Sequence, residues 1–323
     1  MANATNDCQT RLEPARHDAL HEELDAWREN VGAPIAIDAG PVAPARLAGI
    51  DVLSWNVAIG QGRLEAVLDR LRSGADGIGA DPARPLIVLA QEAYREGDTV
   101  PGAPASLHHG GRLRERTRTS VVELAEKNGL SLRYSPSMRN GLHASDRGNA
   151  ILATVRLADA HAFLLPYVRQ RRVTVTSRLA GHPELTFVSA HLDTHGVSRD
   201  QPRGSRSIGA GRAAQAEALA RALPEEQSVI VGADLNSVFG ITDPAVRALV
   251  AAGFHPARRA GQWRHTFHRR LRLLLDHVLY RSPDDRIRSV TVTRLDEVEG
   301  DRSPAVFGSD HHPLLARIEL NGS

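Results

Sequence analysis

The sequence predicts a protein of the α/β (α+β) class, in which two mostly antiparallel β-sheets pack face to face and helices flank them. Apolar runs typical of strands recur from Gly49 to the C-terminus of the 323-residue chain. Several of these runs, from Asn149 to Ala190, follow one another with no helix-like segment between them. This succession argues against a strict alternation of strand and helix and favours two stacked sheets.

The predicted strands are apolar runs bounded by polar or turn-forming residues. They are expected at residues 50–57, 86–91, 130–135, 149–155, 161–166, 172–178, 185–190, 229–234, 273–281, 289–294 and 314–320. Helices are expected between them, at residues 62–72, 120–128, 209–223 and 244–252. Residues 97–118 are rich in Gly, Pro, His and Arg and are expected to form a long surface loop.

Residues 1–48 differ from the rest and are predicted to be an N-terminal extension to a catalytic domain of residues 49–321. Asp18 is a candidate cap for a helix over residues 19–30, in which Leu20, Leu24 and Trp27 recur at helical spacing. A linker containing Pro and Gly follows over residues 32–44. The extension shows no catalytic motif.

Composition limits the class of protein. The formal net charge is only +2, which by itself indicates neither a nucleic-acid binder nor an acidic tail protein. Cys8 is the only cysteine, so no intrachain disulfide can form. No apolar segment approaches the roughly 20 residues that span a bilayer, and no signal-peptide core is visible. We expect a soluble, cytoplasmic monomer, although a misplaced start codon would leave secretion open.

The positive charge is almost entirely arginine, because Lys127 is the only lysine. Arginine binds phosphate through a bidentate fork that lysine lacks. A GC-rich genome would produce the same bias without any functional reason, so local clusters are more informative than the total. They lie at Arg112, Arg114, Arg116 and Arg118, at Arg169, Arg171 and Arg172, and at Arg264, Arg269, Arg270 and Arg272.

Six short polar segments carry the candidate chemistry, and five of them directly follow a predicted strand. Side chains at strand ends lie at a sheet edge, where loops hold functional groups. Carboxylates, amides and imidazoles bind hard cations and move protons. Any one segment alone would be read as an ordinary turn, but their repeated position indicates an enzyme. The segments are Ser54-Trp55-Asn56, Gln91-Glu92, His191-Leu192-Asp193, Gly232-Ala233-Asp234-Leu235-Asn236, Leu275-Asp276-His277 and Ser309-Asp310-His311-His312.

Asp276 lies in a strongly apolar run, where burying a carboxylate is costly unless it has a partner. His311 is the candidate partner, because an Asp–His pair fixes the imidazole tautomer and raises its basicity. Asp310 next to it would point elsewhere and join Glu92 on a hard cation.

The other segments supply groups for water and phosphate. Asp234 and Asn236 are two residues apart and face the same way if the strand continues, so they would orient water and steady the transition state. His191 would donate to a phosphate oxygen or to the leaving group. The amide oxygen of Asn56 would bind a metal ion or orient phosphate.

As a set, these motifs and Gly148-Asn149-Ala150-Ile151-Leu152 resemble the endonuclease/exonuclease/phosphatase superfamily over roughly residues 49–320. The resemblance implies a four-layered α/β sandwich and a divalent cation, usually Mg²⁺, with Mn²⁺ as a possible substitute. It also implies in-line attack of water on phosphorus. By matching motif, the metal ligands are Asn56, Glu92 and Asp310, and the catalytic residues are His191, Asp234, Asn236, Asp276 and His311. Asn149 would contact phosphate, as would Arg147 from its position alone.

These residues specify the bond that is cleaved better than the molecule that contains it. We expect a nuclease or phosphodiesterase, with DNA or RNA as a possible substrate. A phosphatase or phospholipase C-type hydrolase of small-molecule or lipid phosphates is the first alternative, because relatives share the core and differ in loops. A non-catalytic polyanion-binding module that uses the arginine clusters is the second.

Overall fold

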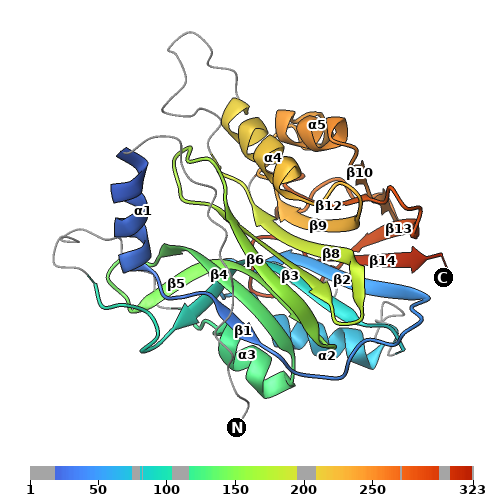
Figure 1. Ribbon diagram of the computed structural model, residues 1–323, viewed down its shortest axis with the longest axis horizontal. Helices are drawn as coiled ribbons and strands as arrows, with labels where there is room; N and C mark the ends of the chain where they lie inside the picture. The colour runs from blue at the N-terminus through green and yellow to red at the C-terminus, as the bar shows by residue number, and fades with distance from the viewer. Residues whose placement is uncertain are drawn as a thin grey trace.

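Two β-sheets form the centre of the computed structural model, which describes residues 19–74, 81, 83–103, 116–194, 209–269, 271–297 and 306–321 (Figure 1). The larger sheet has eight strands, in the spatial order β1 (Ile35–Ile37), β4 (Ser131–Arg139), β5 (Ser145–Ala153), β3 (Leu86–Glu96), β2 (Gly49–Asn56), β14 (Leu314–Leu320), β13 (Ile287–Arg294) and β11 (Arg258–Arg259). The smaller sheet has six, in the order β10 (His255–Pro256), β12 (Asp276–Arg281), β9 (Ser228–Asp234), β8 (His182–His191), β7 (Val173–Leu179) and β6 (Leu157–Leu164).

Most neighbouring strands are antiparallel, as predicted. The parallel pairs are β2–β3, β8–β9 and β11–β13. In two of them, the strands β2, β8 and β9 carry predicted polar segments at their carboxyl ends, and β3 carries Gln91-Glu92 within the strand, beside the end of β2. The mixed topology therefore gathers the candidate chemistry at one edge of each sheet.

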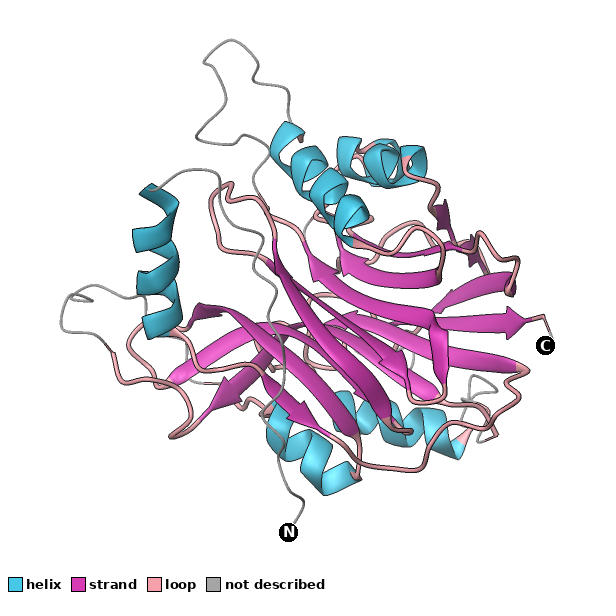
Figure 2. Cartoon of the chain, in the orientation of Figure 1, coloured by secondary structure: helices cyan, strands magenta, loops and turns pink. Residues whose placement is uncertain are grey.

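Helices cover the outer face of each sheet, which gives four layers (Figure 2). The helices α2 (Leu64–Ser73) and α3 (Val121–Asn128) pack on the larger sheet, and α4 (Ala210–Ala222) and α5 (Pro244–Ala251) pack on the smaller one. The helix α1 (Ala19–Asn30) lies beside β4 and β5, and a short 3₁₀ helix, η2, spans Gly240–Thr242. The predicted four-layered sandwich is confirmed. None of the described helices is long and apolar enough to span a membrane.

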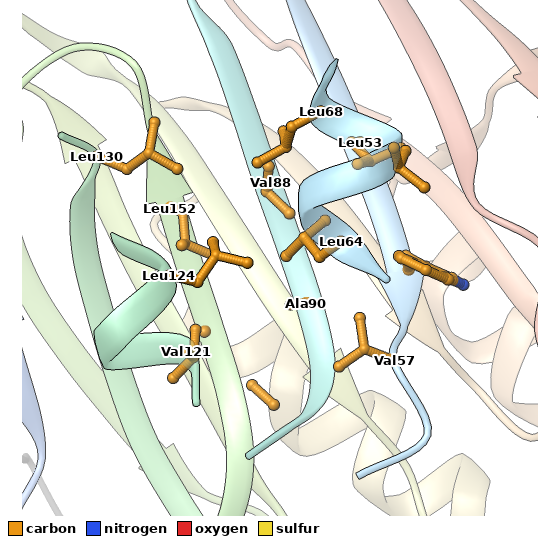
Figure 3. Packing of buried hydrophobic residues seen from close by; sticks show 14 of the residues in the cluster. Leu53, Val57, Leu64, Leu68, Val88, Ala90, Val121, Leu124, Leu130 and Leu152 are labelled. Carbon is orange, nitrogen blue, oxygen red and sulfur yellow. The ribbon is translucent and has the colours of Figure 1, made fainter. Parts of the chain in front are cut away.

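Alternation along the strands divides the core into separate layers. On β3, Leu86, Val88 and Ala90 pack with α2 and α3, whereas Ile87 and Leu89 face the smaller sheet. This period of two is the geometry of a strand that is buried on both faces. Figure 3 shows the first of these layers, where side chains from α2 and α3 interlock with those of β2, β3 and β5. The sequence of such a strand is a continuous apolar run.

The predicted helices are present with ends shifted by at most two residues, whereas the strands differ more. The strands β4, β5 and β6 each have one end four residues from its predicted position, and β3 and β12 differ next to the site. The strand β3 continues to Glu96 instead of ending at Gln91, because a bulge between Ala90 and Ala93 lets pairing with β5 resume. The strand β12 begins at Asp276 instead of Leu273, because the preceding residues bond to Thr266 instead of to a strand. Asp276 is therefore the first residue of its strand.

The predicted linker contributes an edge strand to the larger sheet. Within residues 32–44, β1 pairs antiparallel with β4, with Ile35 opposite Tyr134. Trp27 on α1 donates a hydrogen bond to the carbonyl of Ser137 at 2.7 Å. The domain boundary at residue 48 stays a prediction. Asp18, Cys8 and most of the predicted loop 97–118 lie outside the described residues.

A buried ion pair ties the N-terminal segment to the larger sheet. Arg95 on β3 and Asp146 on β5 are 1% and 0% exposed and are paired through their side chains. Asp146 also accepts hydrogen bonds from the Tyr134 hydroxyl at 2.7 Å and from the Gly32 amide at 2.9 Å. Arg95 donates to the carbonyl of Ala33 at 2.6 Å. One buried charge pair therefore connects three strands to the segment that follows α1.

We expect Arg95→Met to lower the free energy of unfolding by about 3–5 kcal/mol, because it leaves the Asp146 carboxylate buried without its countercharge. Urea unfolding followed by circular dichroism measures this loss. Arg288→Met is the matched control, since its pair with Glu319 leaves Arg288 64% exposed and such pairs contribute about 0–1 kcal/mol. Equal losses in both variants would contradict the assignment.

Candidate active site

Four strand ends meet at the polar edge of the sandwich. Asn56 ends β2 beside Gln91 on β3, and His191 ends β8 beside Asp234 at the end of β9. Asp276 begins β12 directly opposite Asp234. The Asn56 amide joins the two sheets, since its Nδ2 donates a hydrogen bond to Asp234 Oδ2 at 2.9 Å. The structure thus brings together residues that lie more than 200 positions apart in sequence.

Asp234 is the most enclosed carboxylate of the group. It is 1% exposed, and its Oδ1 accepts a hydrogen bond from the backbone amide of Asn236 at 2.9 Å. Burial and the nearby charge of Asp276 raise its pKa to about 7, although His311 and the Asn56 hydrogen bond oppose the shift. A carboxylate with such a pKa is suited to take a proton from water at neutral pH.

Asp276 and His311 form the predicted pair. His311 Nδ1 lies 2.8 Å from Asp276 Oδ2, and both side chains are buried. Burial opposes a charged imidazole here, but Asp276 and Asp234 outweigh it and raise the pKa of His311 to about 10. The His311 ring is therefore an imidazolium at neutral pH, with its Nε2 3.8 Å from Asp234 Oδ2.

Backbone contacts fix the segment that carries His311. The Ser309 hydroxyl accepts from the His311 amide at 3.1 Å and donates to the carbonyl of Asn56 at 2.7 Å. Trp55 Nε1 donates to the carbonyl of His311 at 2.8 Å. The end of β2 therefore positions both Asn56 and the histidine, which explains why Ser54-Trp55-Asn56 and Ser309-Asp310-His311 belong to one site.

His191 lies on the other side of Asp234 and is held by Arg172. Arg172 Nη1 is 3.0 Å from His191 Nδ1, and a guanidinium has only donors, so Nδ1 accepts and the proton lies on Nε2. The Asn236 Nδ2 lies 3.1 Å from Nε2 and donates a hydrogen bond to the carbonyl of Leu192 at 2.9 Å. Nε2 points toward Asp234 Oδ2 at 3.4 Å. Burial and the charge of Arg172 hold the pKa of His191 well below its usual value, so the ring is neutral.

The role of Arg172 was missed from the sequence, which showed it only as a member of the cluster of Arg169, Arg171 and Arg172. It is 3% exposed, and the loop before it is held by Asp193, whose Oδ2 accepts from the amides of Arg169 and Gln170 at 2.8 and 2.7 Å. Asp193 thus holds the loop that leads to Arg172. The only sequence signal was the adjacency of the arginine cluster to a predicted strand.

The three predicted metal ligands offer oxygen atoms around this group. Glu92 is half-buried in the β3 bulge with a φ of +52°, and its charge acts on Arg172 together with those of Asp193 and Asp234. Asp310 Oδ1 is 4.0 Å from His311 Nε2, and its Oδ2 pairs with Arg269 at 2.7 Å. Asn56 Oδ1 accepts only from the Ala58 amide, so one lone pair remains.

These donors fit a hard divalent cation. Carboxylate and amide oxygens are the ligands that Mg²⁺ prefers. Within the described part of the chain the buried Asp276 Oδ1 has no hydrogen-bond partner, and Asp234, Asp276 and His311 bring ligand atoms within 4.8 Å of one another. The excess negative charge of this cluster would be offset by a bound cation. Assignment of the individual ligands stays a prediction.

The two predicted phosphate-binding residues are placed differently. The charge of Arg147 on β5 acts on His191 and Arg172, so it lies near the site, where its Nη1 donates to Asn140 Oδ1 at 2.7 Å. Asn149 is buried and donates to the carbonyl of Val173 on the other sheet. Asn149 therefore bridges the sheets, and its contact with phosphate stays a prediction.

Solved structures resemble this fold over most of the chain. The catalytic domain of human Nocturnin with bound sulfate has a TM-score of 0.54 at 14% identity, covering 87% of this chain and 100% of that one. An endonuclease/exonuclease/phosphatase family protein from Leptotrichia buccalis has a TM-score of 0.52 at 13% identity, covering 84% of this chain and 99% of that one. The mannosyl-6-phosphatase of Bacteroides thetaiotaomicron has a TM-score of 0.50 at 15% identity, covering 84% and 99%. At these identities the likeness shows the fold alone.

No curated protein matches the sequence. Residues 53–311 match the family described as Endonuclease/Exonuclease/phosphatase, which covers more than half of the chain. The match begins at Leu53 on β2 and ends at His311, the residues between which every predicted ligand and catalytic side chain lies. With its buried Asp–His cluster, the chain belongs to the endonuclease/exonuclease/phosphatase family of metal-dependent phosphoester hydrolases.

Proposed function

We propose that this protein is a Mg²⁺-dependent phosphodiesterase that cleaves nucleic acid. The observation that carries the proposal is a groove of about 680 Å³ next to the site. The residues that line the groove include Val238, two residues after Asn236, and Leu274, two residues before Asp276. A substrate lying in this groove would therefore approach the ends of β9 and β12.

Basic and aromatic side chains line the groove. Arg259, Arg264 and Arg272 contribute positive charge, and the Arg259 guanidinium lies 5.5 Å from the centre of the Trp263 ring. Phe239 also lines the groove and is 52% exposed. Arginines that follow a backbone and aromatic rings that stack on bases are the features by which proteins bind single-stranded nucleic acid.

The site residues then have distinct roles in hydrolysis. Asp234 takes a proton from the attacking water, and the Asn236 side chain orients the phosphate. The imidazolium of His311 and the Nε2 proton of His191 offset charge that grows on the phosphoryl oxygens or on the leaving oxygen. Mg²⁺ held by Asn56, Glu92 and Asp310 would supply further positive charge to the phosphoryl group. Arg172 positions His191 through its hydrogen bond to Nδ1.

A phospholipase C-type activity is the alternative that a specific observation favours. Phe239, Ile241 and Leu271 are 52%, 53% and 66% exposed on the loops beside the groove, where apolar side chains would suit a lipid surface. A phosphatase activity has the support of the similar fold of the mannosyl-6-phosphatase alone. Membership of an enzyme family and the paired Asp276 and His311 weigh against a non-catalytic polyanion-binding module.

We expect Asp234→Asn to reduce hydrolysis of bis-p-nitrophenyl phosphate by about 10²–10⁴-fold, because the variant keeps the shape but removes the general base. EDTA is expected to abolish the wild-type reaction, and Mg²⁺ to restore it. Asp69→Asn on the exposed face of α2 is the control and should react at the wild-type rate. Full activity of Asp234→Asn, or of the wild type in EDTA, would contradict the mechanism.

We expect Asp276→Asn to lower the pKa of His311 from about 10, since the variant removes the carboxylate that most favours the imidazolium while the opposing burial stays. The imidazolium should then titrate at lower pH, which ¹⁵N NMR of the histidine rings in EDTA measures directly. The resonance of exposed His255 should not move. A His311 pKa that stays near 10 would show that another group sets it.

We expect wild-type protein with Mg²⁺ to nick plasmid and to degrade single-stranded DNA or RNA. The double variant Arg264→Gln/Arg272→Gln should bind these substrates with a weaker salt dependence, in which the slope of log K against log salt concentration falls by about 2. Arg221→Gln, which removes an exposed charge from α4, should keep the wild-type slope. Parallel assays with phosphatidylcholine and sphingomyelin vesicles and with phosphate monoesters separate the alternatives. Intact nucleic acid after prolonged incubation with Mg²⁺ or Mn²⁺ would exclude the nuclease.

A further inference from the structure

A second cluster of ionisable side chains lies on the far side of the segment that carries His311. It consists of His265, His268 and His312, and one ring nitrogen of each lies within 4.8 Å of a ring nitrogen of the other two. The His312 ring centre is 5.4 Å from that of His265 and 5.2 Å from that of His268. The cluster takes no part in the proposed hydrolysis.

Two of these rings carry buried nitrogens that have no hydrogen-bond partner among the residues that the structure describes. His312 is 3% exposed, and its Nε2 is unpartnered while its Nδ1 faces Asp296 Oδ1 at 2.7 Å. His268 Nδ1 is also buried and unpartnered. A buried polar nitrogen without a partner costs free energy, so such atoms need an explanation in a native protein. A bound ion in the cluster would satisfy both.

We propose that His265, His268 and His312 form a binding site for a transition metal ion of the Zn²⁺ type, separate from the oxygen-ligand site of the reaction. Three imidazole nitrogens suit Zn²⁺, Co²⁺ or Ni²⁺, whereas Mg²⁺ prefers oxygen. Asp296 on His312 Nδ1 gives the carboxylate–histidine arrangement that orients metal-binding imidazoles. Three protein ligands leave a fourth position for water or an anion.

The protonation state of the cluster agrees with metal binding. Burial, aided by Arg294, lowers the pKa of His265 to about 4, and burial also lowers that of His268. Both rings are therefore neutral at pH 7 and have a lone pair for an ion. Arg294 Nη1 lies 3.2 Å from His265 Nε2, so binding requires this guanidinium to leave the ring. Arg294 keeps its bond to Asp296 Oδ2 at 2.9 Å.

An ion at this site would join two segments that position the catalytic pair. The His268 amide donates to the carbonyl of Asp310, and the His312 amide donates to that of Thr266, each at 2.7 Å. Between these bonds, the Phe267 ring packs on His311 with centres 5.0 Å apart. The Thr266 hydroxyl accepts from the amide of Asp276 at 3.0 Å. The metal would therefore stabilise the relative positions of Asp276 and His311 through residues 266–268, without contact with substrate.

Cobalt provides the test, because tetrahedral Co²⁺ absorbs visible light and reports its own ligands. Chelator-treated full-length protein in excess Mg²⁺ is titrated with Co²⁺ and then with Zn²⁺, and melting temperature is followed in parallel. We expect one equivalent of Co²⁺ with a tetrahedral spectrum, displacement by Zn²⁺ and a raised melting temperature. Asp296→Asn should weaken binding by about 10–100-fold. His268→Ala should lose the spectrum and the rise in melting temperature.

His255→Ala removes an exposed histidine from β10 and should keep both signals. Asp234→Asn should also keep them, which separates this site from the reaction's metal. If His268→Ala does not fold, His265→Gln at a half-buried position replaces it and should likewise lose the Co²⁺ spectrum and the rise in melting temperature. The proposal is overturned if wild-type protein shows no Co²⁺ spectrum, or if the spectrum survives the loss of a cluster histidine. Neither result depends on which phosphoester is cleaved.

Discussion

The arrangement of the site depends on one interaction, in which the imidazolium of His311 lies between two buried carboxylates, Asp234 and Asp276. Both are at most 2% exposed, and His311 is the ionisable group that contacts them both. One imidazolium cannot neutralise two carboxylates, so the cluster retains negative charge, which is reflected in the raised pKa of Asp234. The opposite strand supplies only a neutral amide, Asn56. The fold therefore builds a place for a cation before any ligand arrives.

This arrangement imposes constraints on the backbone around it. Glu92 and Asn236 have φ values of +52° and +48°, a region that non-glycine residues seldom adopt, and both carry site side chains. The Glu92 bulge turns a side chain out of the strand alternation. At Asn236, the Asp234 carboxylate accepts the backbone amide and so stabilises the turn. Rigid, buried strands on either side hold these unfavourable conformations in place.

Much of the fold was predictable because burial on both faces leaves continuous apolar runs and because helices leave their own spacing. The Asp276–His311 pair was also predictable, since a carboxylate within an apolar run requires a partner. The bulge in β3 was not predictable, because polar Gln91-Glu92 after an apolar run indicates the end of a strand. Only the pairing with β5 shows that the strand continues. Arg172 was not predictable either: nothing local distinguishes a buried arginine that pairs with a distant histidine from its exposed neighbours. Likewise, Asp193 holds a loop that sequence cannot place.

The described residues between Trp263 and Leu275 contact both the catalytic pair and the groove proposed to bind substrate. Thr266 holds the amide of Asp276, and Phe267 packs on His311, so the inner side of this segment sets the catalytic pair. Arg264 and Arg272 on the same segment line the groove. A substrate bound to these arginines would therefore contact the same backbone that positions Asp276 and His311. The more rigid this backbone is, the more closely the positions of the two catalytic side chains would depend on the bound substrate. Because His265 and His268 also lie there, an ion held with His312 would stiffen the connection between binding and catalysis.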